Sequence, residues 1–132
     1  MAGISAFSQA NMLNWSLNNV AATRPAAWSV GLSLGVPSSI SGSEISTTLL
    51  ATPRQTLQMA AAASPAGSCS NTNALTFGAV ASSCTISGLQ IWDTAASVGG
   101  NMLWYGTLTT ARALNAGDSL VFSVGALIIT LA

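Results

Sequence analysis

The sequence lacks histidine and lysine, and charged side chains of any kind are scarce in it. Its 132 residues include three arginines, two aspartates and one glutamate, which balance to a formal net charge of zero. Soluble domains usually carry about a quarter charged residues, and charge keeps protein surfaces apart in solution. We therefore expect other protein to cover much of this surface. Three scattered arginines cannot neutralise a phosphate backbone, so we expect no nucleic-acid partner.

Long hydrophobic runs are also missing, although 50% of the residues are hydrophobic. The best apolar run, residues 125–132, is far shorter than the ~20 residues of a membrane-spanning helix. Residues 1–11 have neither the basic region nor the long apolar core of a secretory signal. Met1 therefore predicts an untrimmed cytosolic start, with no membrane partner. The length predicts one domain over residues 1–132.

The two cysteines are too few for a scaffold built on disulfides. Cys69 and Cys84 either close a modest loop as a disulfide or remain free thiols, as in a reducing cytosol. Without histidine or a third cysteine they cannot complete a metal site. The glycines are scattered rather than grouped in a phosphate-binding loop, so the sequence predicts no cofactor.

Residues 117–120 spell GDSL, the nucleophile block of a large esterase family. A serine hydroxyl without a base is a weak nucleophile, and the chain has no histidine to serve as one. Glycine and aspartate here predict a β-turn instead. The three carboxylates, Glu44, Asp93 and Asp118, are expected to pair with arginine or to accept hydrogen bonds in turns. The sequence predicts neither an enzyme nor a small-molecule substrate.

Residues 28–36 alternate without error between apolar residues and serine or glycine, which predicts a half-buried strand. Its flat small-residue face suits either close contact with another protein layer or solvent. Alternation and turn residues predict further strands over residues 44–50, 55–61, 74–77, 86–93, 102–108 and 119–131. A change of phase near Gly125 and Ala126 predicts a β-bulge in the last of these.

A helix is predicted over residues 8–20, with Ser8 as its N-cap. Its apolar stripe consists of Ala10, Leu13, Leu17 and Val20. Residues 37–43 and 64–73 are predicted loops. The fold class that follows is all-β: an antiparallel, jelly-roll-like β-sandwich with a short N-terminal helix.

The large aromatic side chains are the main candidates for contacts outside the chain. Trp28 lies on the regular apolar face of its strand and is expected in the core. Trp104 and Tyr105 are adjacent in a strand, so they point to opposite faces. Tryptophan and tyrosine are enriched at interface hot spots. The candidate interface residues are Trp15, Trp92, Trp104 and Tyr105.

Residues 91–131 also carry a pattern of glycine, asparagine, aromatic and aliphatic positions in a fixed order. These positions are Ile91, Trp92, Asp93, Gly99, Gly100, Asn101, Leu103, Gly106, Leu108, Thr109, Gly117, Asp118, Phe122, Gly125, Leu127, Ile129 and Leu131. In this pattern the chain resembles a family of small tailed-bacteriophage virion proteins, often labelled tail fibre proteins. The N-terminal half follows the family more loosely, and the cysteines and the alanine run at residues 60–63 depart from it.

The resemblance implies a virion structural protein that is assembled in the cytoplasm of a bacterial host. Its small β-rich module, without shaft, coiled coil or collagen-like repeat, favours a capsid cement or decoration protein. The partners would then be the major capsid protein and further copies of the chain, as a homo-oligomer. A tail fibre or tail-adaptor subunit is the alternative. A lectin-like module with tryptophans as sugar-stacking platforms is the third hypothesis.

Overall fold

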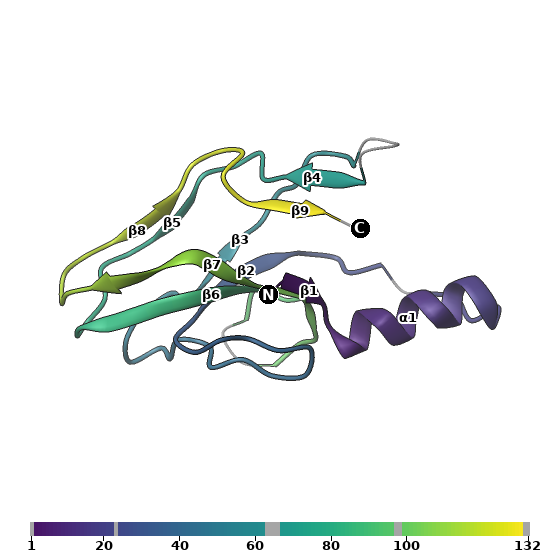
Figure 1. The fold of residues 1–132 in the computed structure, drawn as a ribbon, viewed down its shortest axis with the longest axis horizontal. Helices are drawn as coiled ribbons and strands as arrows, with labels where there is room; N and C mark the ends of the chain where they lie inside the picture. Colours follow the sequence, from purple (N-terminus) through teal and green to yellow (C-terminus); the bar gives the residue numbers. More distant parts are fainter. Residues whose placement is uncertain (1, 23, 63–66, 97–98, 131–132) are drawn as a thin grey trace.

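The computed structural model describes residues 2–22, 24–62, 67–96 and 99–130, which form a β-sandwich with one helix (Figure 1). The larger layer is an antiparallel five-stranded sheet in the order β1-β7-β6-β2-β3. Its strands are β1 (Ala2–Ile4), β7 (Met102–Leu114), β6 (Cys84–Trp92), β2 (Ser29–Ser33) and β3 (Arg54–Thr56). The predicted all-β sandwich with a short N-terminal helix is thereby confirmed.

The second layer is a two-stranded ribbon with an interruption. Its strands are β4 (Ser68–Ser70), which pairs with β9 (Ile128–Thr130), and β5 (Leu75–Phe77), which pairs with β8 (Leu120–Phe122). Backbone hydrogen bonds from Ala60 to Ser70 (2.8 Å) and from Thr72 to Gln58 (2.8 Å) join the ribbon to the segment after β3. Among the described residues no strand joins β8 or β9 to β1 or β7. We call this unjoined side of the sandwich the seam.

The core lies between the two layers. Strand alternation sends Val30 and Leu32 of β2 and Leu89 and Ile91 of β6 toward it, all at most 7% exposed. From the ribbon, Phe77 meets Phe122 edge to face, with ring centroids 6.2 Å apart. Trp28 packs against this cluster, as its place in the alternation predicted.

The small-residue face of β2 is covered by the chain itself. All five residues of β2 are buried. A Cβ on Gly31 would lie 2.4 Å from Oε1 of Glu44, so only glycine leaves room for that carboxylate. The Ser33 hydroxyl donates a hydrogen bond to the carbonyl of Gly35 (2.8 Å). The chain itself therefore covers this face, with Glu44 over Gly31 and the Ser29 hydroxyl bonded to the carbonyl of Thr94.

The predicted strand at residues 44–50 is wrong. Ile45 donates one backbone hydrogen bond to Leu32, and the N–H groups of Leu49 and Leu50 then both bond to the carbonyl of Ser46. The segment is therefore a tight turn that buries Ile45 and Leu50 in the core. Its apolar residues reflect this burial rather than a strand. Sequence analysis also missed β1, and it placed β4 in a loop.

The C-terminal region, predicted as one bulged strand, is divided into β8 and β9 by a turn. Gly125 in this turn has φ +78°, a conformation that favours glycine. The side chain of Asn71, 1% exposed, fills the interruption. Its Nδ2 donates to Ser123 O (3.0 Å) and to Asn73 O (2.7 Å), and its Oδ1 accepts from Leu127 N (2.9 Å). The face on which the apolar residues lie does change between β8 and β9, as the sequence indicated. At this interruption the side-chain amide of Asn71 supplies hydrogen bonds in place of backbone bonds between the two strands of the ribbon.

Candidate interaction surfaces

The helix α1 (Ala6–Leu17) starts two residues earlier than the sequence predicted. Its N-cap is Ser5, whose Oγ accepts from the N–H of Ser8 (3.1 Å) and donates to the carbonyl of Met102. The backbone of Ser5 also donates to Leu103 O (2.9 Å). Ser5 is 1% exposed, so the cap fastens the base of the helix to β7. The predicted helix 8–20 is therefore corrected to residues 6–17, and its predicted cap Ser8 to Ser5.

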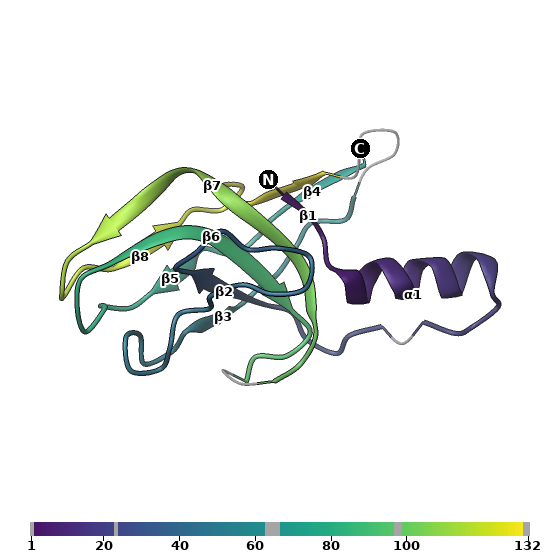
Figure 2. The same cartoon turned by 60° about the horizontal axis from the view of Figure 1, so that its bottom comes forward.

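Beyond this base, α1 projects from the sandwich as an arm (Figures 1 and 2). None of its residues is buried. Trp15 is 67% exposed, the highest value among the four interface candidates. Its apolar neighbours in and just after the helix are exposed as well: Phe7, Met12, Leu13, Leu17 and Val20. An apolar surface of this kind is a candidate contact site.

Trp92 ends β6 on the face opposite the core and is only partly exposed. The guanidinium of Arg54 lies over its ring, with Cζ 4.0 Å from the ring centroid. Arg54 also makes a two-bond ion pair with Glu44, Nε to Oε1 at 2.6 Å and Nη2 to Oε2 at 2.9 Å. Its third nitrogen donates to the carbonyls of Thr94 (3.3 Å) and Gly99 (3.0 Å). This cluster joins β3, β6 and two loops.

A second side of Trp92 borders a cavity of about 310 Å³ at the base of α1. The indole N–H of Trp92 is buried and has no hydrogen-bond partner among the described residues. The apolar side chains around the cavity include Phe7, 41% exposed, and Ile40, 80% exposed. Sequence analysis missed both residues, because nothing in the local pattern places residues 37–43 beside the start of the helix.

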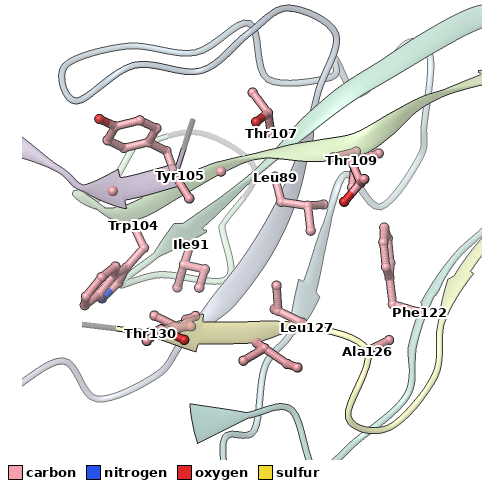
Figure 3. A pocket seen from close by; sticks show the side chains of 16 residues that line it. Leu89, Ile91, Trp104, Tyr105, Thr107, Thr109, Phe122, Ala126, Leu127 and Thr130 are labelled. Carbon is pink, nitrogen blue, oxygen red and sulfur yellow. The ribbon is translucent and has the colours of Figure 1, made fainter. Parts of the chain in front are cut away.

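Trp104 and Tyr105 point to opposite sides of β7 (Figure 3). Trp104, which pairs with Ile91, packs against the core cluster and points into the seam. Tyr105 lies on the other side, over Gly3 of β1, where a Cβ would come within 2.9 Å of the tyrosine Oη. Both rings are half-buried, so neither is a freely exposed platform.

The seam holds a cavity of about 330 Å³. Its lining comes from β1, β6 and β7 on one side and from β8, β9 and the turn between them on the other, and it contains no charged residue. Figure 3 shows Leu89 and Ile91 across from Leu127. Such a lining suits an apolar group, and the polar side-chain groups that it offers are the hydroxyls of Tyr105, Thr107, Thr109 and Thr130.

The two cysteines are free thiols in the structure. Cys69 lies in β4 opposite Ile129 of β9, and Cys84 begins β6 opposite Leu114 of β7. The two residues thus belong to different layers, and the disulfide that the sequence left open is not formed. Partial burial raises the pKa of the Cys84 thiol, because it disfavours the thiolate.

The carboxylates have structural roles of the kind the sequence predicted. Glu44 pairs with Arg54. Asp93 accepts from the backbone N–H and the side-chain amide of Asn101, at 2.7 and 2.8 Å. Asp118 accepts from the N–H of Asn115 (2.8 Å) in the turn that contains the GDSL letters.

Within the described residues no three histidine, cysteine or acidic side chains gather as a metal site. The same residues contain no helix with the length and apolar character needed to cross a membrane.

A match to one protein family agrees with the pattern at residues 91–131. No curated protein matches the chain. The family model of Podophage GP4 fiber I protein gp80 matches residues 3–130, which is nearly the whole sequence. The chain therefore belongs to this family of tailed-phage virion structural proteins.

Proposed function

We propose that this protein is a subunit of a fibre on a podophage-type particle. The observation that carries the proposal is the family match over residues 3–130, since the family description names a fibre protein. Two structural features agree with it: the β-sandwich gives a rigid module, and α1 provides an exposed apolar arm for attachment. We further propose that the protein acts by binding and has no catalytic activity.

We propose that the protein has no catalytic activity because its reactive side chains have structural roles. Glu44 holds a buried arginine, while Asp93 and Asp118 each accept backbone hydrogen bonds in turns. The hydroxyl of Ser119 lies in a chain without histidine. Assays with ester and glycoside substrates should therefore give background rates.

A capsid cement or decoration role is the second candidate, and the scarcity of charge favours it. In that role the partner would be the major capsid protein, and many copies would each add a modest interface. The two roles differ in position and copy number. A fibre subunit belongs at the tail in few copies, whereas a cement protein covers the head in hundreds.

The experiment is therefore to locate and count the protein in purified particles. Antibody-gold labelling gives the position, and quantitative mass spectrometry gives copies per major capsid protein, which serves as the internal standard. Labelling at the tail region with a low copy number supports the fibre proposal. Labelling over the head with a copy number near that of the capsid protein overturns it in favour of the cement role.

The lectin-like hypothesis places sugar on tryptophan. Arg54 covers one face of Trp92, and Trp104 points into the seam, so neither ring is an open platform on the surface. Glycan-array binding by the native protein that is lost in Trp92→Ala or Trp104→Ala, but kept in Trp15→Ala, would revive this hypothesis. We expect no glycan binding that depends on Trp92 or Trp104.

A further inference from the structure

The apolar stripe of α1 is exposed, and its first residue, Ala6, also lines the cavity at the base of the helix. Ala6, Ala10, Leu13 and Leu17 are four, three and four residues apart. At 3.6 residues per turn they fall within an arc of about 60°. Leu13 is 56% and Leu17 is 75% exposed. This alternation of four and three is the spacing of the contact line between two helices that pack side by side.

The three least exposed residues of the same helix are polar, and the exposed rings of Phe7 and Trp15 share their side of it. Ser8, Asn11 and Asn14, three residues apart, are partly buried, whereas Ala6 and Ala10 of the stripe are exposed. A surface helix ordinarily does the reverse and turns its apolar side toward its own core. The stripe is therefore placed for contact with something outside the chain.

The lack of charge on α1 indicates which kind of partner contacts the stripe. No charged residue occurs before Arg24, so α1 and its flanks carry none. In a symmetric contact the same surface of both copies meets, so a stripe with charges of one sign would repel its counterpart. An uncharged stripe avoids this cost. A different charged partner, by contrast, would find no complementary charge on the arm.

We infer that α1 is a self-association element, in which the helices of neighbouring copies pack together through Ala6, Ala10, Leu13 and Leu17. The helix projects beyond the sandwich (Figure 2), and the stripe residues on it are exposed, so a second helix can reach them. Trp15 lies about 140–180° around the helix from the four stripe residues, on the opposite side. It therefore stays outside the helix pair. The inference does not depend on whether the protein sits at the tail or on the head.

The first test measures the mass of the full chain by sedimentation velocity from about 10 μM to about 1 mM. The native protein should rise with concentration from 13.2 kDa to a multiple of it. The double variant Leu13→Gln/Leu17→Gln should stay monomeric over the range, a loss of at least tenfold in affinity. The matched control Trp15→Gln should assemble like the native protein. A native protein that stays monomeric throughout overturns the inference, as does assembly lost in the control but kept in the double variant.

A second variant separates lost contact from misfolding. Ala10→Glu places like charges along the stripe without removing a large apolar side chain. It should dissociate the assembly at low salt, and added salt should restore it by screening the repulsion. A misfolded variant would not recover in this way. Assembly of Ala10→Glu that equals the native protein at low salt contradicts the inference.

Helicity gives a further readout. A twelve-residue helix with no buried residue is marginal on its own. The helical circular dichroism signal of the native protein should therefore increase with concentration, and that of Leu13→Gln/Leu17→Gln should not. An identical concentration dependence in both proteins would contradict the inference.

Discussion

Arg54 stacks on Trp92, with its guanidinium carbon 4.0 Å from the centroid of the indole ring, while it holds Glu44 in a two-bond ion pair. The arginine side chain is 2% exposed and that of Glu44 is 17% exposed. Besides the ion pair, the guanidinium donates to two backbone carbonyls of the loop after β6. One cation therefore links a strand, an aromatic ring and two loops.

Removal of the Glu44 charge should destabilise the fold. In Glu44→Gln the buried guanidinium of Arg54 loses its counter-charge, which costs about 3 kcal/mol of unfolding free energy. Urea unfolding of the purified protein measures this cost. The control is Arg24→Met, because Arg24 lies over Trp28 at 5.1 Å as an exposed pair. Such a pair contributes at most about 1 kcal/mol. Equal stability of Glu44→Gln and native protein would contradict the structural role of the ion pair.

Replacement of Asn71 should open the ribbon at its interruption. Asn71→Ala removes three side-chain hydrogen bonds and leaves the N–H of Leu127 without its acceptor. We expect a loss of about 2–3 kcal/mol in unfolding free energy, since a buried polar group without a partner costs about 1–3 kcal/mol. Amide hydrogen exchange should accelerate most at Leu127. Thr72→Ala, at the exposed neighbouring position, should leave exchange unchanged. Equal acceleration in both variants would argue against the role of the amide.

The two serines near the start of α1 should respond differently to substitution. Ser5→Ala removes the cap and a buried hydrogen bond to β7, so it should lower stability by about 1–2 kcal/mol and reduce helicity. Ser8→Ala keeps the backbone N–H that donates to the Ser5 Oγ, so it should change the stability very little. Thermal unfolding and circular dichroism measure both effects. The reverse order of effects would restore Ser8 as the cap.

The Cys84 thiol should become reactive only at high pH. Burial raises its pKa in the folded protein, so the thiolate fraction near neutral pH is lower than in the unfolded chain. Alkylation by iodoacetamide, followed by mass spectrometry of the Cys84 peptide, should be slower in the folded protein than in urea at the same pH.

The raised pKa of Cys84 also makes the free energy of unfolding depend on pH in a defined direction. A raised folded pKa means that the stability contribution is full below the unfolded pKa of the thiol, ~8.5, and is lost as pH rises through the folded value. Cys84→Ser should remove this alkaline decline. If the loss of stability at alkaline pH persists unchanged in Cys84→Ser, another titrating group causes it.

Period-two alternation was sufficient to predict β2, β5 and β6, because their core faces carry the large apolar residues. The same rule failed at residues 44–50, where Ile45 and Leu50 are buried by a turn that mimics a strand pattern. It also failed for β4, whose sequence Ser-Cys-Ser has no apolar face. The pairing of that strand depends on β9, nearly sixty residues away, and local sequence does not encode it.

The sequence predicted the candidate surfaces only in part, because local sequence does not encode the contacts that position them. An apolar helix with Trp15 is visible in the sequence, but its projection from the sandwich depends on the bond between Ser5 and β7. The half-buried state of Trp92 depends on Arg54, which lies 38 positions earlier in the chain. Only the tertiary fold brings these residues together.

The few charges of this chain are largely used within the molecule. Arg54 and Glu44 satisfy each other, Arg24 lies over Trp28, and the two aspartates accept hydrogen bonds in turns. If the protein binds other virion proteins as proposed, those contacts should depend mainly on apolar area and neutral hydrogen bonds, which salt screens little. We expect the protein to remain on the particle when ionic strength changes enough to release components held by opposite charge. A particle that moves between dilute and concentrated salt would thus keep this part of its structure in both.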